Sequence, residues 1–243
     1  MRLDQALVAR GLAATRARAR DLILRGAVKV DDRVAENPGH VVSAAMQLEV
    51  AGGGNDHVAR SAAKLIAALD MFGLSPKGRI ALDIGASTGG FTQVLLERGA
   101  AKVYAVDVGH GQLHASLAKD RRVASLEGTD VRALDRHLIA EPVEAIAADV
   151  SFISLAKALP AALALAAPGC WLAALVKPQF ELSPAQIGKG GIVKDPADGP
   201  RALARMADWI AAQPGWRVTG TSASPLPGKA GNQEYLVGAI HGG

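Results

Sequence analysis

The residues best suited to chemistry begin at a glycine-rich turn that follows a short apolar run. The run and the turn read ALDIGASTGGF over residues 81–91, with Gly85, Gly89 and Gly90 on the turn. In a parallel α/β sheet, ligands bind beyond the carboxyl end of such a strand, where the chain turns into a helix. A dinucleotide fingerprint needs glycine where this chain has Ser87, because the backbone must approach a pyrophosphate closely. The turn therefore disfavours a nicotinamide cofactor without excluding it.

Aspartates near this turn indicate which ligand it suits. Asp107 lies 22 residues after Gly85, at the end of the second expected strand, where a carboxylate can accept hydrogen bonds from ribose hydroxyls. Asp83 before the turn and Asp130 after the third strand offer acceptors to an adenine amino group or a sulfonium, but not to a pyrophosphate. The amides after Gly89 suit a single carboxylate at a helix N-terminus. These charges favour S-adenosylmethionine, although each aspartate alone also fits a helix cap or a turn.

The elements that must position these residues alternate between strands and helices. Strands are expected at 80–84, 103–107, 123–126, 145–149 and 171–177, helices at 91–97, 114–118, 154–167 and 202–212, and a closing edge hairpin near 218 and 235–240. Apolar strands that alternate with helices form a parallel sheet covered on both faces. The sequence therefore predicts an α/β fold with a doubly wound, Rossmann-like sheet.

A different pattern precedes this region. Two short helices are expected at 3–9 and 15–24, followed by strands around the two-acid turn in GAVKVDDRV. Three glycines in AGGGNDH predict a linker. We therefore expect a small α+β domain at 1–50, a linker at 51–58 and the doubly wound domain at 59–243.

The small domain carries a basic cluster. Residues 10–29 contain one acidic side chain, Asp21, and six basic ones, Arg10, Arg16, Arg18, Arg20, Arg25 and Lys29. Arg16 and Arg20 are four residues apart, which places both on one face of the expected helix. A cluster of this kind is either a solvated helix face or the footprint of a nucleic acid.

The overall composition is that of a globular protein with a modest positive charge. The 243 residues carry a formal charge of +4, and 49% are hydrophobic, which is ample for a core. A single cysteine, Cys170, excludes an internal disulfide, and the charged N-terminus lacks a signal peptide, so we expect a cytoplasmic protein. The uncharged stretch 158–176 is divided by Pro160 and by Pro168-Gly169, which predicts a helix and a strand and no stable membrane association.

The first fifty residues resemble the S4-type RNA-binding module. The blocks RLDQALVARGL, TRARARDLILRG and VKVDDRV occur in that family's order. The resemblance implies RNA binding, with contacts made mostly to phosphates. We expect RNA contacts from Arg2, Arg16, Arg18, Arg20, Arg25 and Lys29, and in the second domain from Arg60 and Lys189.

The whole chain resembles the TlyA family of S4-containing rRNA 2'-O-methyltransferases, whose class I catalytic domain is FtsJ-like and which has also been labelled haemolysin. The matching blocks are DIGASTGGFTQVLLERGAAKVYAVDVGHGQL, ADVSFIS, VKPQFE, GKGGIVKDP and GNQEYL. The resemblance implies S-adenosylmethionine as cofactor, ribosomal RNA in an assembled subunit as partner and a cytidine as target. The short stretch before RLD favours the large subunit.

The resemblance also implies a catalytic tetrad, which it places on Lys64, Asp149, Lys177 and Glu234. Asp149 and Lys177 each end an expected strand, and Glu234 begins the last one. In-line methyl transfer requires a ribose hydroxyl to lose its proton, and a lysine base works best when burial or a cationic neighbour lowers its pKa from about 10.4. We expect Lys177 to take or polarise the proton and Asp149 to hold Lys177 near the sulfonium. Lys64 and Glu234 then position the ribose.

One departure from the family pattern lies next to Lys64. The family reads Arg-Gly-Gly-x-Lys where this chain has Arg60, Ser61, Ala62, Ala63 and Lys64, which adds methyl groups where the substrate is expected to pass. The glycine-containing loop at 181–199 carries Lys189 and is expected either to cover the site or to contact RNA.

Two other functions compete with methyl transfer. The chain fits an RNA-binding protein that has lost turnover through the altered segment, or a membrane-lytic protein as the haemolysin label suggests, although it contains no amphipathic basic helix for that purpose. The dispersed histidines His110, His114 and His137 do not predict a metal site.

Overall fold

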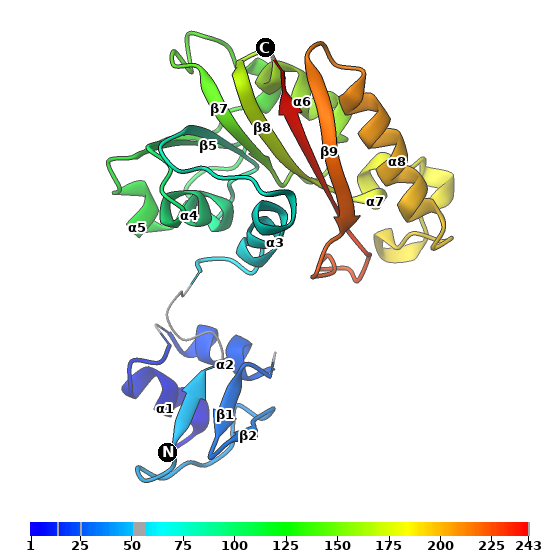
Figure 1. The fold of residues 1–243 in the computed structure, drawn as a ribbon. Coiled ribbons are helices and arrows are strands. Elements are labelled where there is room, and N and C mark those ends of the chain that lie inside the picture. Colours follow the sequence, from blue (N-terminus) through cyan, green and yellow to red (C-terminus); the bar gives the residue numbers. More distant parts are fainter. Residues whose placement is uncertain (14, 25, 51–56, 243) are drawn as a thin grey trace. The chain divides into compact units, whose positions relative to one another are not determined.

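A computed structural model describes residues 1–243 except 14, 25, 51–56 and 243. The chain forms two compact units, Met1–Asp56 and His57–Gly243. Figure 1 shows both units. Most of the predicted linker, and Arg25 of the predicted RNA contacts, lie outside the described residues.

The first unit is a small α+β domain, as the sequence predicts. Helices α1 (Leu3–Ala9) and α2 (Arg16–Leu24) precede an antiparallel sheet of order β2-β1-β3, built from β1 (Val28–Val30), β2 (Arg33–Val34) and β3 (Leu48–Val50). Asp31 and Asp32 have φ angles of 46° and 66°, a left-handed conformation that aspartate tolerates better than most residues. These two residues therefore form the tight turn between β1 and β2.

The second unit is built on a seven-stranded sheet of order β6-β5-β4-β7-β8-β10-β9. Its strands are β4 (Ile80–Ile84), β5 (Lys102–Asp107), β6 (Val123–Glu127), β7 (Val143–Ala148), β8 (Ala166–Val176), β9 (Trp216–Ala223) and β10 (Tyr235–His241). The pairings from β6 through β8 are parallel, whereas β10 is antiparallel to both β8 and β9. The chain order reverses between β4 and β7, which is the position where a doubly wound sheet binds its ligand.

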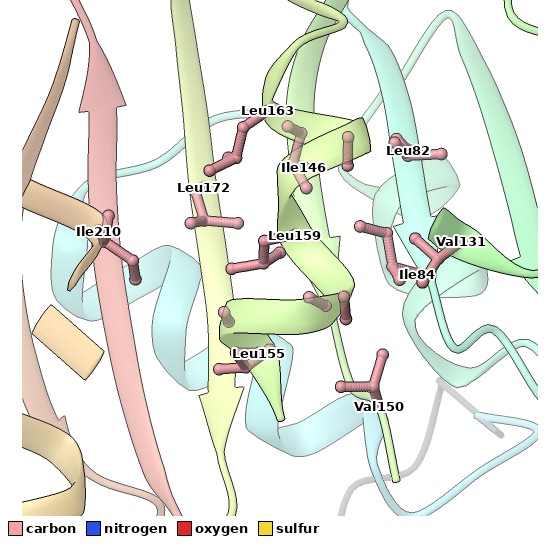
Figure 2. Packing of buried hydrophobic residues seen from close by; sticks show 14 of the residues in the cluster. Leu82, Ile84, Val131, Ile146, Val150, Leu155, Leu159, Leu163, Leu172 and Ile210 are labelled. Carbon is pink, nitrogen blue, oxygen red and sulfur yellow. The ribbon is translucent and has the colours of Figure 1, made fainter. Parts of the chain in front are cut away.

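Helices on both faces of this sheet enclose two hydrophobic clusters. The helices of this unit are α3 (Ala62–Phe72), α4 (Gly90–Glu97), α5 (Ala115–Ala118), α6 (Leu155–Leu163), α7 (Pro178–Glu181) and α8 (Asp198–Ala211). Successive side chains of a strand point to opposite faces, so Leu82 and Ile84 pack in the cluster that contains α6, while Ala81 packs in the cluster that contains α3 and α4. Figure 2 shows the first cluster, with Leu155 and Leu159 of α6 lying over the sheet.

The uncharged stretch at 158–176 differs from its prediction in one respect. The helix ends at Leu163, with Pro160 inside it, and β8 already begins at Ala166. Pro168 and Gly169 therefore do not separate a helix from a strand, but lie within β8, where its register with β7 shifts and Gly169 has a φ angle of 78°. A proline is tolerated there because an irregular position needs no ladder hydrogen bond from it. None of the helices formed by the described residues has the length and apolar character needed to cross a bilayer.

Candidate active site

A cleft of about 1040 Å³ opens at the carboxyl ends of β4, β5 and β7. Its walls come from the turn after β4, the end of β5, the segment around Asp130, the loop that follows β7, and the end of α7. This is the edge of the sheet, next to the reversal of strand order, at which the sequence predicts ligand binding. The volume lies at the upper end of the range for small-molecule sites.

The glycine turn on the floor of the cleft is held tightly between two strands. Gly85 has a φ angle of 82°, and a Cβ atom added there would lie 2.5 Å from the backbone oxygen of Asp149. The amides of Gly85 and Ala86 donate to the carbonyl of Val106 at 2.9 and 3.1 Å. Glycine is required at position 85 because both the backbone angle and the close approach of the β7 end exclude a side chain.

The carboxylate of Asp107 fixes the turn and faces the cleft. Its Oδ2 accepts a hydrogen bond of 2.8 Å from the amide of Ser87, and its Oδ1 accepts one of 2.8 Å from the amide of Gly109. Each carboxylate oxygen can accept more than one bond, so Asp107 keeps acceptor capacity for a ligand hydroxyl. Ser87 itself has a φ angle of 47° and lines the cleft beside Asp107.

Glu127, at the end of β6, supports the loop that follows Asp107, and the sequence reasoning missed it. Its carboxylate accepts hydrogen bonds from the amides of Gly111, Gln112 and Leu113 at distances of 2.6 to 3.1 Å. These bonds, the one from Leu113 first, lower the pKa of Glu127. Gln112 on this loop lines the cleft, whereas Glu127 does not. Glu127 therefore shapes the wall by holding the loop from behind.

Asp83 is buried beneath the cleft and does not line its wall. The alternation along β4 turns its side chain towards α4, where Oδ2 accepts a 2.6 Å hydrogen bond from the hydroxyl of Thr92. Its Oδ1 has no hydrogen-bond partner among the described residues. Burial, with smaller contributions from the charges of Asp149 and Asp107, raises the pKa of Asp83 to about 7. Any direct ligand contact by this carboxylate remains a prediction.

Gly89 and Gly90 also lie behind the turn and not on the cleft wall. A Cβ atom added to Gly89 would collide with Leu117, and one added to Gly90 would lie 2.8 Å from the Cβ atom of Ala59. These glycines therefore allow the start of α4 to pack closely against its neighbours. Their predicted contact with the cofactor is likewise not part of the cleft as the structure describes it.

Asp130 both lines the cleft and caps a short helix. Its side chain accepts from the amide of Arg132 at the start of the 3₁₀ turn η1 (Val131–Ala133) and pairs with the guanidinium of the same arginine. The hydrogen bonds from Arg132 lower the pKa of Asp130 to about 2. The sequence offered capping as an alternative to ligand binding, and the structure confirms the capping while keeping the residue on the wall.

Lys177 and Asp149 form an ion pair beside the cleft. The Nζ atom of Lys177 lies 2.6 Å from Oδ1 of Asp149, at an angle outside ordinary hydrogen-bond geometry, and 3.0 Å from the hydroxyl of Ser151, to which it donates. Asp149 and Ser151 line the cleft. The side chain of Lys177 is largely buried, and its amine is held after the end of β8 by the charge of Asp149 and by the hydrogen bond to Ser151.

Lys64 and Glu234 form a second, more deeply buried ion pair. The Nζ atom of Lys64, in the first turn of α3, lies 2.5 Å from Oε2 of Glu234, and the two residues are 5% and 3% exposed. Tyr235 pairs with Val176 in the sheet. Glu234 immediately precedes Tyr235, and Lys177 immediately follows Val176. The two residues therefore lie at the same end of the adjacent strands β10 and β8. The structure thus gathers the predicted tetrad into two ion pairs at one edge of the sheet.

The altered segment before Lys64 does not intrude into the cleft. Ala62 is 1% exposed and packs in the core as the first residue of α3, and the hydroxyl of Ser61 lies against Gly90. Neither residue is among those that line the cleft. The methyl group of Ala62 therefore lies in the protein interior, whereas Ser61 is half-buried. The guanidinium of Arg60, a predicted RNA contact, donates to the carbonyl of Pro227 at 3.2 Å.

The basic residues of the first unit have different roles. Asp4 is fully buried, and hydrogen bonds from Arg2 and then Arg16 hold its pKa below the usual value. The guanidinium of Arg10 is committed to the carbonyls of residues 43, 44 and 46. Arg20 is exposed on α2. The side chain of Arg18 lies outside what the structure describes, and Lys29 is half-buried in β1.

Lys189, the remaining predicted RNA contact, lies on a loop tied to the last strand. It is exposed in the 3₁₀ turn η3 (Lys189–Gly191). The side chain of Asn232 accepts from the amide of Val193 at 3.0 Å and donates to the carbonyl of Gly191 at 2.8 Å. These bonds fix the position of the Lys189 loop next to the strand that follows Glu234.

Two aromatic residues at the cleft were not singled out from the sequence. Phe152 is 91% exposed, has a φ angle of 65° and lies with its ring centroid 5.2 Å from that of Phe180. Both line the cleft, as does Glu181. The blocks ADVSFIS and VKPQFE contain these residues, but a family block shows no exposure, so only the structure distinguishes them from core aromatics.

Comparison with known families now adds to this geometry. Residues 57–240 match the FtsJ-like methyltransferase family, and residues 1–48 match the S4 domain. A Mycobacterium tuberculosis protein named 16S/23S rRNA (cytidine-2'-O)-methyltransferase TlyA is 47% identical over 97% of this chain and 88% of its own length. The chain belongs to the TlyA family. Two further relatives are named Putative rRNA methyltransferase YqxC, of Bacillus subtilis, at 43% identity (97% of this chain, 84% of the relative), and Hemolysin A, of Brachyspira hyodysenteriae, at 37% identity (98% of each).

Solved structures share the fold of this chain. A putative hemolysin from Streptococcus thermophilus superposes with a TM-score of 0.74 at 36% identity and covers 100% of this chain and 88% of its own. A Burkholderia thailandensis N-methyltransferase with bound S-adenosylhomocysteine is 20% identical, covers 77% of this chain and 80% of its own, and has a TM-score of 0.53, which shows a shared fold. The predicted S4-like domain followed by a Rossmann-like class I methyltransferase domain is therefore confirmed.

Proposed function

We propose that this protein transfers a methyl group from S-adenosylmethionine to a ribose 2'-hydroxyl of ribosomal RNA, with cytidine as the target nucleoside. The observation that carries the proposal is the amine of Lys177, held 2.6 Å from the carboxylate of Asp149, which itself lines the cleft. The name of the relative from Mycobacterium tuberculosis supports the substrate class. The S4 domain supports RNA as the partner.

The cleft fits S-adenosylmethionine better than a dinucleotide. Gly85 forms part of the floor, at a position where a Cβ atom would meet the backbone of Asp149. The walls carry the carboxylates of Asp107, Asp130 and Asp149. The basic residues on the wall are Lys157 and Arg132, and Arg132 is paired with Asp130. A pyrophosphate would face repulsion from this set, whereas a sulfonium and an adenosine find acceptors. When bound, S-adenosylmethionine supplies an electrophilic methyl group on a cationic sulfur.

Individual cofactor contacts follow from the positions of the side chains. We assign the ribose hydroxyls to Asp107, the adenine end to Asp130 and the cationic end to Asp149, with Gly85 and Ser87 providing the floor. Asp83, Gly89 and Gly90 then act from behind the turn by holding the start of α4, since none of them lines the cleft.

The chain's own residues prepare the RNA hydroxyl. As an ammonium, Lys177 polarises the 2'-hydroxyl; once it has lost a proton to solvent, its neutral amine accepts the hydroxyl proton. Its two partners, Asp149 and Ser151, keep the amine in one place, which reduces the entropy cost of reaching the reactive geometry. The buried pair of Lys64 and Glu234 positions the ribose. A buried ion pair contributes little net stability, so its presence at this edge is consistent with a functional role.

Two surfaces favour an RNA substrate. The exposed ring of Phe152 stands at the cleft beside Ser151, where an unstacked base would find an aromatic surface. The first unit offers exposed guanidinium groups of Arg2, Arg16 and Arg20 for phosphates. Together they support RNA as the substrate, and the resemblance to TlyA proteins implies a folded rRNA in an assembled ribosomal subunit. A cytoplasmic location follows from this partner and agrees with a free, buried Cys170.

The test is to incubate the purified protein and labelled S-adenosylmethionine with each ribosomal subunit and with naked rRNA, and to map ribose methylation. Lys177→Ala should lower the rate about 10²–10⁴-fold without changing cofactor affinity. Lys177→Arg keeps the positive charge but cannot release a proton, so it should fail similarly. Lys77→Ala, at an exposed lysine outside the cleft, is the control. Full activity of Lys177→Ala would refute the assignment.

The competing functions predict other results. Cofactor binding without methylation of any rRNA would favour the RNA-binding protein without turnover. The Brachyspira hyodysenteriae relative bears the name Hemolysin A, and leakage of liposomes caused by the pure protein would favour membrane lysis.

A further inference from the structure

The loop that follows β7 carries both an ion-pair partner of Lys177 and the exposed Phe152. Its residues 149–154 all line the cleft. Phe152 has a φ angle of 65°, which a bulky side chain adopts only where the surrounding structure holds the backbone in place. The ring is 91% exposed, so its own burial does not supply that restraint.

The restraint comes from α7, immediately behind the loop. The ring of Phe180 lies 5.2 Å from that of Phe152 at an interplanar angle of 49°. One residue later, Oε1 of Glu181 accepts a 2.8 Å hydrogen bond from the amide of Leu155, the first residue of α6. Two consecutive side chains of α7 therefore contact the loop: Phe180 at Phe152, and Glu181 at the C-terminal end of the loop.

The bond from Glu181 replaces the usual helix cap. Ser154 occupies the N-cap position of α6 but makes no side-chain capping bond. The amides of a helix N-terminus need an acceptor, and a carboxylate is favoured there by the helix dipole. Glu181 provides this acceptor from a site 26 residues away, and its carboxylate is half-buried. Burial, as the largest cause, raises the pKa of Glu181, so this contact is made at a cost in solvation.

We propose that Glu181 is a positioning residue: it fixes the start of α6 and thereby holds the preceding loop so that Phe152 is preorganised to receive an RNA base. The inference rests on the proposed function, because Phe152 is assigned to RNA there. Without the carboxylate, the first turn of α6 loses its acceptor and the loop relaxes towards ordinary backbone angles. RNA must then restore the loop on binding, which raises the KM for RNA.

The test compares Glu181→Ala with Glu181→Gln and with a matched control. A glutamine retains an oxygen that can accept from Leu155, so it should behave within about twofold of the wild type. Glu144→Ala removes a similar bond, which the amide of Ile80 donates to Oε2 of Glu144 at 2.9 Å, near the opposite edge of the sheet. Glu181→Ala should raise the KM for the methylated rRNA about tenfold, the scale of one lost hydrogen bond to a charged group.

A double-mutant cycle separates positioning from general destabilisation. If Glu181 acts through Phe152, Phe152→Ala should itself raise the KM, and adding Glu181→Ala should raise it no further. The inference would be overturned if the two substitutions raised the KM multiplicatively in the double variant. It would also be overturned if Glu181→Gln or Glu144→Ala raised the KM as much as Glu181→Ala does.

Hydrogen exchange gives a readout that does not depend on methylation. Amides of residues 150–156 should exchange faster in Glu181→Ala than in the wild type, and not in Glu181→Gln or Glu144→Ala. Unchanged exchange in Glu181→Ala overturns the inference even if the wild type methylates rRNA. If no rRNA is methylated, the proposed function fails, while faster exchange still identifies Glu181 as the residue that holds the loop.

Discussion

Replacing Gly85 with alanine should damage both stability and methyl transfer, and Gly78 provides a matched control. Both glycines have left-handed backbone angles, with φ of 82° at Gly85 and 72° at Gly78. A Cβ atom at Gly78 would meet nothing within 4 Å, whereas one at Gly85 would lie 2.5 Å from the backbone oxygen of Asp149. The pair therefore separates the cost of the backbone angle from the cost of the contact.

The expected magnitudes follow from these two terms. The left-handed angle costs an alanine about 1–2 kcal/mol at either position. At Gly85 the overlap adds about 1–3 kcal/mol, because the end of β7 is held by the bond from the amide of Asp149 to Ile84 and cannot yield freely. Asp149 must withdraw by about 0.9 Å to reach ordinary contact with the new methyl group. A displacement of roughly this size near a reacting group lowers rates about 100-fold.

Urea unfolding and single-turnover methylation of rRNA measure the two effects. Gly78→Ala should lose only the backbone term and keep nearly full activity. Gly85→Ala should lose about 1–3 kcal/mol more and about 100-fold in rate. Equal destabilisation of the two variants, or full activity of Gly85→Ala, would refute the argument that the glycine exists to admit the end of β7.

Three further predictions concern charges. Burial raises the pKa of Asp83 to about 7 from 3.8, so the folded state alone binds a proton between these values and stability falls as pH rises from about 4 to 7. Asp83→Asn should remove this slope in unfolding measured at pH 5 and pH 8, and an unchanged slope would contradict it. Lys64→Met leaves the charge of Glu234 buried without a partner and should lower the free energy of unfolding by about 3–5 kcal/mol. Adding Glu234→Leu should restore stability in urea but not activity. A double variant as unstable as Lys64→Met would count against the importance of this ion pair. Exposed Arg20 should contribute to the salt dependence of rRNA binding, so Arg20→Ala should lower the slope of log K against log salt concentration by about 1. Arg10→Ala should leave this slope unchanged, because the guanidinium of Arg10 already binds three carbonyls. Equal slopes for the two variants would oppose the assignment.

The sequence located the polar residues at strand ends with good accuracy. Asp107 and Lys177 lie at the ends of apolar runs that the sequence analysis predicted to be buried strands. Because the carboxyl ends of parallel strands share one edge, both were expected at the ligand edge. It did less well for Asp83. That residue is inside a strand, and which face it points to depends on where the neighbouring helices pack. The structure turns it towards α4 and away from the cleft.

Contacts between distant segments were beyond the reach of local patterns. The pair of Lys64 and Glu234 joins residues 170 positions apart, and its expectation came from family resemblance and not from spacing. The bond between Glu181 and Leu155 had no sequence signal, since Ser154 offers the ordinary N-cap and the structure does not use it.

The sequence by itself determined the alternation of strands and helices, the glycine turn and the set of charged residues, because these depend on hydrophobic period and on backbone freedom within a few residues. Only the tertiary structure decided which of those charges meet, which glycines line the cleft and which aromatic side chain reaches solvent. Such contacts are set by strand register and helix packing across the whole domain, and a one-dimensional pattern does not contain that information.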